Sequence, residues 1–156
     1  MKKFALREAG FTLIELLVVV LIIGILASIA IPQYFKVVER AKTAEAQAFL
    51  SNVKNSNERY LARTGVYVTA MGNIAALDVS FPGSSPNYGM KNFKVANMAP
   101  VATCPGTSDP GYTLDVQRIT NNSGVSPRYG SYTMQLSRCT GDISFVSCGN
   151  CDTDLN

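Results

Sequence analysis

One acidic side chain, Glu15, stands inside an apolar segment long enough to cross a membrane. The segment Phe11 to Ile31 spans 21 residues and contains no other charged residue. A carboxylate in hydrocarbon costs several kcal/mol unless it is protonated or paired with a cation, which makes Glu15 a candidate functional group. Its chemistry would be ion pairing, but no Lys, Arg or His lies between Phe11 and Gln33 to supply the cation.

A cation for Glu15 would arise if the chain were cut after Gly10. Residues 1–10 form a short basic leader, and Gly10 is small and flexible enough to enter a peptidase site in an extended form. The cut would leave a new amino group on Phe11, about one helical turn before Glu15. The amine and the carboxylate could pair within one chain or between neighbouring chains, and only the second pairing builds an assembly.

The run Gly10–Val19, with the sequence GFTLIELLVV, resembles the processing and assembly motif of type IV pilins and of type II secretion pseudopilins. The resemblance implies that a prepilin peptidase cuts after Gly10 and that Phe11 becomes an N-methylated first residue. It also implies that Glu15 sets the register of each subunit by pairing with the Phe11 amine of a neighbour. An ordinary secretory signal peptide or a plain membrane anchor would give no reason for Glu15.

The resemblance is close from Lys2 to about Pro32 and holds in outline to about Tyr67. Two positions in this part have implied roles, since Gly24 and Pro32 would bracket a helical segment that can lose its regular hydrogen bonding in a filament. Both residues can also act in a purely structural way. Glycine allows close helix packing, and proline bends a helix where it leaves the bilayer.

Periodicity predicts one helix from Phe11 to Arg63, with a membrane-spanning part (residues 11–32) and an amphipathic part (residues 33–64). Gly65 is a natural terminator for this helix. The apolar stripe of the second part is expected to comprise Val38, Ala41, Ala44, Ala48, Phe49, Val53, Asn57 and Tyr60, and Leu50 is expected to be buried with it. The other faces are expected to carry Lys36, Glu39, Arg40, Lys42, Glu45, Lys54, Glu58 and Arg59.

The rest of the chain, residues 65–156, is expected to form a globular head. Alternating apolar and polar residues predict strands at Lys91–Asn97, Tyr112–Ile119, Tyr129–Arg138 and Asp142–Ser147. The segment 72–88, rich in Gly, Ser, Pro and Asn, is expected to be a loop that joins helix to sheet, and the Cys-rich C-terminus is also expected to be a loop. The predicted fold class is therefore α+β, with a long N-terminal helix packed on a roughly four-stranded antiparallel sheet, as in the pilin fold.

All four cysteines, Cys104, Cys139, Cys148 and Cys151, lie in the second half of the chain. An even number of cysteines beyond a membrane segment predicts disulfides, and spacing alone leaves all three pairings open. The motif Cys148-Gly-Asn-Cys151 has neither the βαβ context of a redox site nor the second pair or histidines of a zinc site. The resemblance to pilins, in which a bridge commonly closes a loop near the C-terminus, favours Cys139 bonded to Cys148 or Cys151. Cys104 would then take a remaining partner.

Charge predicts the location of the chain. The leader carries three bases and one acid, so it is expected to stay in the cytoplasm while the head lies in the periplasm. The precursor would therefore sit in the inner membrane, and the mature protein would move to the pilus at the cell surface. Removing the leader lowers the formal net charge from +3 to +1. This near neutrality argues against nucleic acid as the main partner.

The sequence gives no support for an enzyme, a cofactor or a metal site. The chain has no histidine and no acid pair in a recognisable motif. Three acidic residues near the tail are too sparse for a calcium loop and are expected on solvated surface: Asp142, Asp152 and Asp154. Three basic residues near the expected loops are too few to indicate a DNA-binding or ligand-binding module: Arg118, Arg128 and Arg138.

The predicted function is structural: a pilin that polymerises through its apolar helix into an extracellular type IV filament for adhesion, motility or DNA uptake. Its expected partners are further copies of itself, the prepilin peptidase and an inner-membrane assembly platform. The alternative is a pseudopilin of a type II secretion system. A membrane-anchored binding module or minor pilin is a more remote alternative.

Overall fold

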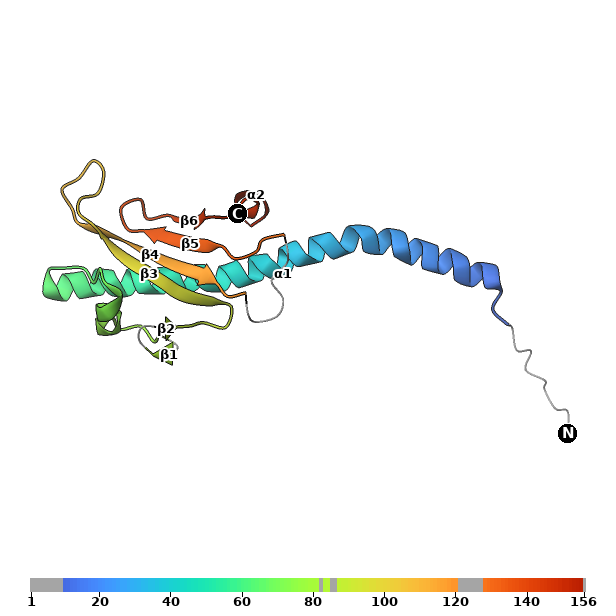
Figure 1. Ribbon diagram of the computed structural model, residues 1–156, viewed down its shortest axis with the longest axis horizontal. Coiled ribbons are helices and arrows are strands. Elements are labelled where there is room, and N and C mark those ends of the chain that lie inside the picture. Colours follow the sequence, from blue (N-terminus) through green and yellow to red (C-terminus); the bar gives the residue numbers. More distant parts are fainter. Residues whose placement is uncertain (1–9, 82, 85–86, 121–127, 156) are drawn as a thin grey trace, which may run out of the picture. The chain divides into compact units, whose positions relative to one another are not determined.

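The computed structural model describes residues 10–81, 83–84, 87–120 and 128–155, so the predicted leader lies almost wholly outside the described residues. The chain forms two compact units, of which one ends at Phe35 and the other begins at Lys36. The elements, in chain order (Figure 1), are helix α1 (Leu13–Thr64), 3₁₀ helix η1 (Met71–Ala76), strands β1 (Gly83–Ser84), β2 (Asn87–Tyr88), β3 (Phe93–Val101), β4 (Gly111–Arg118), β5 (Thr133–Ser137) and β6 (Ile143–Val146), and helix α2 (Cys151–Asp154).

Helix α1 has nearly the predicted bounds. It runs through Pro32 without a break and ends at Thr64, where Gly65 adopts a positive φ of 78°. The Gly65 N–H donates to the Leu61 carbonyl at 2.8 Å, which closes the last turn. Glycine is favoured here because it has no Cβ to clash in the left-handed conformation.

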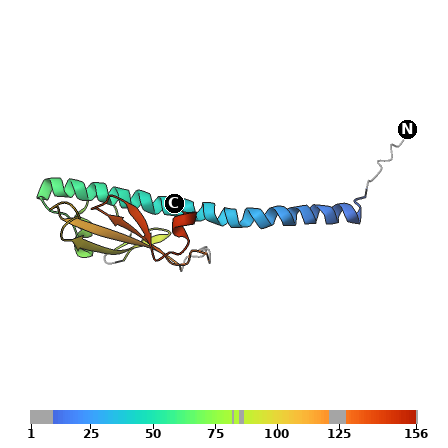
Figure 2. The same cartoon turned by 90° about the horizontal axis from the view of Figure 1, so that it is seen from above.

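In the unit that begins at Lys36, a four-stranded antiparallel sheet in the order β3-β4-β5-β6 lies along α1 (Figure 2). Alternate residues of the strands face the helix, as the sequence predicts. On β4 these are Tyr112, Leu114 and Val116, and on β5 they are Met134 and Leu136. The helix and this sheet confirm the predicted α+β fold class.

The buried face of α1 differs from the predicted stripe. It comprises Glu39, Thr43, Ala46, Leu50, Val53, Ser56 and Asn57. Val53 and Asn57 were predicted correctly, whereas Ala41, Ala44 and Ala48 are exposed. The physical reason is that the structure next to the helix offers Arg118 and Tyr132 as partners for Glu39, which brings the face that carries Glu39 inward.

The two segments predicted as loops contain short elements. Within the described part of residues 72–88 lie η1 and the two-stranded sheet β1–β2, and the C-terminal segment contains α2. These elements lack the alternating apolar residues that predicted β5 and β6, as the sequences MGNIAA of η1, GS of β1 and CDTD of α2 show. Buried side chains fix them instead, with Ile74 in η1 and Cys151 in α2.

The disulfides pair Cys104 with Cys139 and Cys148 with Cys151. The expectation that Cys139 would bond to Cys148 or Cys151 is therefore wrong. The sheet order gives the reason, because Cys104 follows β3 and Cys139 follows β5, on either side of the central strand β4. The bridge crosses the start of β4 at Gly111.

Gly111 is expected to be required for the Cys104–Cys139 bridge. A Cβ at this position would lie 2.5 Å from Cys139 Sγ and 2.8 Å from Cys104 Sγ. We expect Gly111→Ala to leave both cysteines reduced and to cost about 2 to 5 kcal/mol of unfolding free energy. Alkylation under denaturing conditions followed by mass spectrometry measures the free thiols.

Gly72→Ala is the matched control, because no atom lies within 4 Å of a Cβ built at Gly72. It should show no free thiols. A fully oxidised Gly111→Ala protein with unchanged stability would contradict the expectation.

Candidate assembly site

The apolar part of α1 exposes its large side chains in the unit that ends at Phe35. Phe11 is 83% exposed, and the exposed set continues through Leu13, Ile14, Leu16, Leu17, Val18, Val19, Val20, Leu21, Ile22, Ile23, Ile25, Leu26, Ile29 and Ile31. By length and composition α1 can cross a membrane, with an 18-residue window of mean hydropathy 3.0. So large an apolar surface needs lipid or other protein around it.

Glu15 is held at the start of α1 by Thr12. The Thr12 backbone N–H and the Thr12 hydroxyl each donate to Glu15 Oε2 at 2.8 Å. In return the Glu15 N–H donates to the Thr12 hydroxyl oxygen at 3.3 Å. This reciprocal arrangement is a capping box, which satisfies amide groups that the first helical turn leaves without partners.

Thr12 is a helix-capping partner of Glu15 that the charge-based reasoning missed. The spacing Thr-x-x-Glu immediately before an apolar run is a signal for a capping box and would have identified it. The structure thus gives Glu15 neutral donors from its own chain. The carboxylate remains on an exposed surface, where a cation could reach it.

Gly10 and Phe11 lie just before the helix, in a stretch without regular secondary structure. Phe11, Glu15 and three apolar residues (Ile14, Val18 and Val19) line an open hollow of about 390 Å³. The hollow offers an apolar surface beside a carboxylate.

Gly24 and Pro32, the other two predicted assembly residues, both lie within α1. A Cβ built at Gly24 would meet no atom within 4 Å. Their predicted role in a filament therefore stays a prediction, since α1 is helical at both positions in the single chain.

The second cluster of interest lies in the other unit, between α1 and the sheet. Glu39 is 1% exposed, and its Oε1 accepts hydrogen bonds from Arg118 Nε at 2.7 Å and from the Tyr132 hydroxyl at 2.9 Å. Arg118 Nη1 donates to the carbonyls of Asn92 at 2.9 Å and Ile119 at 3.0 Å. Helix α1, strand β4 and the loop residues next to β3, β4 and β5 therefore meet at this buried ion pair.

The electrostatics of this cluster favour the ionised pair. Burial alone raises the pKa of the Glu39 carboxyl, but the hydrogen bonds from Arg118 and Tyr132 outweigh it, and the net pKa lies below its ordinary value. Burial also raises the pKa of the Tyr132 hydroxyl, and the neighbouring Glu39 charge adds to that effect. Glu39 is therefore an anion and Tyr132 a neutral donor near neutral pH.

Two expectations about surface charge are wrong. Arg118 is 2% exposed and Asp154 is 5% exposed, although both were expected near solvent. Each is paired with an opposite charge: Arg118 with the equally buried Glu39, and Asp154 with the partly exposed Lys36. Among the described residues no group of three or more metal-ligating side chains occurs.

Comparison with known proteins supports the motif. Residues 6–31 match the family model for the prokaryotic N-terminal methylation motif. The chain is 43% identical over 148 residues to the fimbrial protein EcpC of Eikenella corrodens, a match that covers 94% of each protein. No solved structure matches the chain significantly.

Shorter matches join the chain to named major pilins. It is 34% identical over 96 residues to the type IV major pilin PilE1 of Neisseria gonorrhoeae, and 43% identical over 65 residues to the type IV major pilin PilA of Myxococcus xanthus. These matches span 52% and 30% of those two relatives. Together with the near full-length match to the Eikenella protein, they show that the chain belongs to the type IV pilin family.

Proposed function

We propose that this pilin is made as a membrane-anchored precursor, is cut after Gly10, and then polymerises through residues 11–32 into a filament on the cell surface. The exposed apolar face of α1 carries this proposal, because a helix that must be covered on every side can be covered by copies of itself. The named relatives are pilins and fimbrial proteins, which favours a pilus over a type II secretion pseudopilus.

Cleavage would convert Glu15 from a capped side chain into an assembly contact. Both Thr12 donors reach Oε2, and among the described residues Oε1 accepts no hydrogen bond. A new ammonium on the Phe11 of a neighbouring chain could therefore bond to Oε1 while the cap stays in place. A charge-assisted hydrogen bond in an apolar setting is stronger than a neutral one.

The two contributions to assembly differ in kind. Packing of apolar helices provides the attraction but specifies little about axial position, since one aliphatic side chain resembles the next. The ion pair specifies position, because any other register leaves a carboxylate and an ammonium unpaired in an apolar environment. Glu15 would thus select one helix offset among many of similar packing energy.

Before the cut, the leader would lie in the cytoplasm and the head in the periplasm. The Phe11 amine would be methylated after the cut. The prepilin peptidase and an inner-membrane assembly platform would be the partners at this stage. The role is structural and requires no cofactor.

Fibres sheared from cells provide the direct test. We expect electron microscopy to show thin filaments whose subunit, by mass spectrometry, begins at a methylated Phe11. Filaments built from subunits that keep residues 1–10, or a protein found only as isolated monomers in the membrane, would overturn the proposal.

Gly10→Val is expected to block processing, because a β-branched side chain next to the scissile bond cannot enter a site shaped for glycine. The precursor mass should persist and fibres should be absent. Gly10→Ala is the control and should still be cut, since a methyl group adds little bulk. Normal maturation of the valine variant would contradict the assignment of the cleavage site.

A further inference from the structure

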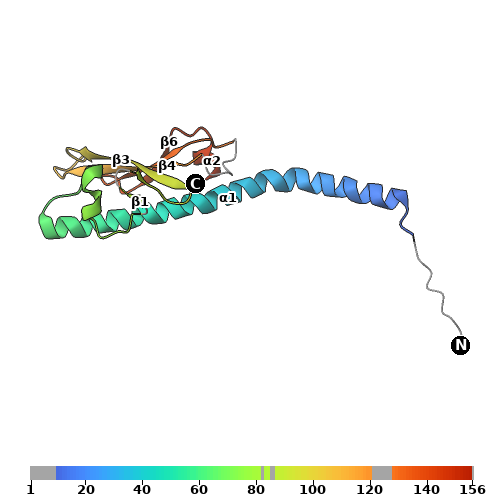
Figure 3. The ribbon, with the colours of Figure 1, turned by 60° about the horizontal axis from the view of Figure 1, so that its bottom comes forward.

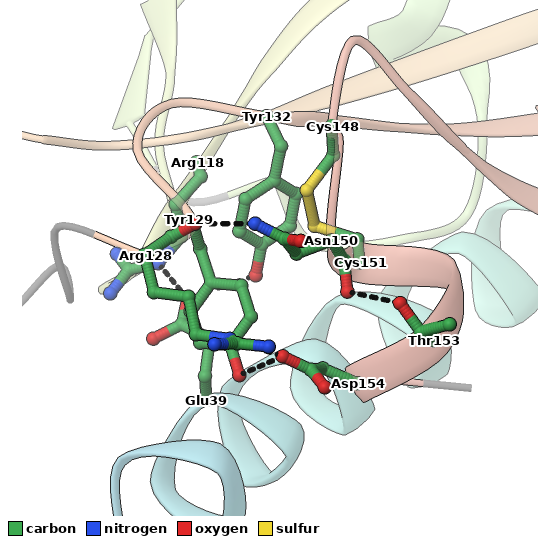
Figure 4. Close-up of a disulfide and its surroundings, with 10 residues drawn as sticks. All are labelled: Glu39, Arg118, Arg128, Tyr129, Tyr132, Cys148, Asn150, Cys151, Thr153 and Asp154. Atoms are coloured by element: carbon green, nitrogen blue, oxygen red, sulfur yellow. Dashed lines mark hydrogen bonds and ion pairs between the residues drawn. A yellow bond between two sulfur atoms is a disulfide. The ribbon is translucent and has the colours of Figure 1, made fainter. Parts of the chain in front are cut away.

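The C-terminal helix α2 is attached to α1 mainly through Asp154. Lys36 Nζ lies 2.8 Å from Asp154 Oδ1, and Oδ2 accepts hydrogen bonds from Arg128 Nε and, at 3.2 Å, from the Tyr129 hydroxyl. Arg40 Nε donates to the Asp154 backbone carbonyl at 2.7 Å. Figure 4 shows Tyr129 and Asp154 pointing toward one another, and Figure 3 shows α2 beside α1.

No disulfide holds α2 onto the rest of the head. The Cys148–Cys151 bridge has a sequence separation of 3, so it closes a small loop within the C-terminal segment. The Cys104–Cys139 bridge joins the ends of β3 and β5 and does not reach α2. The attachment of α2 to α1 is therefore noncovalent.

A helix as short as α2 is not stable on its own. It has four residues, whereas isolated helices shorter than about 12 residues are marginal in water. The Cys148–Cys151 bridge closes the loop that leads into it, and the buried side chains of Cys151 and Leu155 add apolar contact. The helix therefore depends on its docked position, in which the Asp154 carboxylate pairs with Lys36 and Arg128.

We propose that residues 148–155 form a latch that closes the head onto α1, with Asp154 as its positioning residue, and that the latch opens while the sheet and both disulfides stay intact. Opening separates Asp154 from Lys36 and Arg40 on α1. It also releases the segment that carries Arg128 and Tyr129, because Asn150 Nδ2 donates to the Arg128 carbonyl at 3.4 Å in the closed form.

Acid should weaken the latch. Hydrogen bonds from Arg128 and Lys36 lower the pKa of Asp154 from 3.8 to about 2. A lowered pKa means that the carboxylate stabilises the closed form above its ordinary pKa, and that this stabilisation is lost as the pH falls through about 2. The facing groups are Lys36 and Arg40 from α1 and Arg128 and Tyr129 from the segment before β5, while Asp152 on α2 is exposed.

Hydrogen exchange of the full chain in detergent micelles at neutral pH tests the latch. In Asp154→Asn we expect amides of residues 148–155 and 128–131 to exchange roughly tenfold faster or more, with the strands β3 to β5 unchanged, as local opening predicts. Asp152→Asn is the matched control, since it removes the same charge from an exposed position on the same helix. It should exchange like the natural protein.

Two results would overturn the latch: equal exchange in Asp154→Asn and Asp152→Asn, or loss of protection in the sheet together with α2. If Asp154→Asn fails to fold, Lys36→Gln removes one partner and should give the same localised change with a smaller amplitude. An acid titration followed by NMR adds a readout specific to the carboxylate. The α2 amides of the natural protein should shift between about pH 4 and pH 2, and an unchanged α2 spectrum over this range would also overturn the proposal.

Discussion

Replacing Glu15 with leucine is expected to abolish fibre formation while the protein is still processed and inserted into the membrane. The variant would leave the Phe11 ammonium of each neighbouring subunit in an apolar environment without a partner. A lone charge at such depth costs about 3 kcal/mol, which corresponds to roughly a hundredfold loss in each subunit addition. Quantifying sheared fibres against total mature protein in the membrane measures the effect.

Two further variants separate the charge of Glu15 from its role as a helix cap. Glu15→Gln retains an oxygen that can accept hydrogen bonds from Thr12 but carries no charge, so it should fail like leucine. Thr12→Val removes the hydroxyl of the cap and keeps the carboxylate, so it should still form fibres. Fibres at natural yield from Glu15→Gln would show that capping, and not ion pairing, is the contribution of Glu15.

The second large effect is expected at the buried pair Glu39–Arg118. Glu39→Ala leaves the Arg118 guanidinium inside the head without its anion, and breaking one side of a buried pair typically costs about 3 to 5 kcal/mol. The exposed Glu45 provides the control, and Glu45→Ala should change the unfolding free energy by less than about 1 kcal/mol. Denaturant unfolding followed by tyrosine fluorescence gives both values.

A double replacement distinguishes the cost of an unpaired charge from the value of the pair. In Glu39→Leu with Arg118→Met both charges of this pair are removed together, so much of the lost stability should return. The double variant should also lose some acid sensitivity. The pKa of Glu39 is lowered in the folded protein, so its contribution is present above its ordinary value of 4.5 and fades as the pH falls below it. A double variant less stable than Glu39→Ala would contradict this account.

The sequence predicted the elements whose patterns are long. The apolar segment, the end of α1 near Gly65 and the four strands of the main sheet were identified because each repeats its spacing several times. The motif around Gly10 to Glu15 was identified because an acid in an apolar run is rare and costly. The short elements η1, β1, β2 and α2 escaped because tertiary contacts, and not local pattern, determine them.

The sequence contained a pattern that indicates the buried ion pair, but we had assigned all charged residues to exposed faces. Arg118 continues the alternate positions of Tyr112, Leu114 and Val116, and so shares the inward face of β4. Glu39 continues, at helical spacing, the buried face that contains Leu50. That assignment missed the burial of both Glu39 and Arg118. The two residues are 79 positions apart in the sequence, and their contact depends on how the helix lies on the sheet.

The disulfide pairing could not be predicted from the sequence, because it also depends on how distant segments are arranged in the fold. Four cysteines give three pairings of similar plausibility, and strand order decides among them. Once β4 is placed between β3 and β5, Cys104 and Cys139 become neighbours across Gly111. Gly111 marks this site in the folded chain, but in the sequence it looks like any glycine of a turn that leads into a strand.

The uninterrupted course of α1 from Leu13 to Thr64 has a mechanical consequence. In the proposed filament, a pull along this helix would reach the head first at Lys36 and Glu39, which pair with Asp154 and Arg118. Charge would therefore resist such a pull at the near end of the head, and apolar contact around Leu50 would resist it farther along.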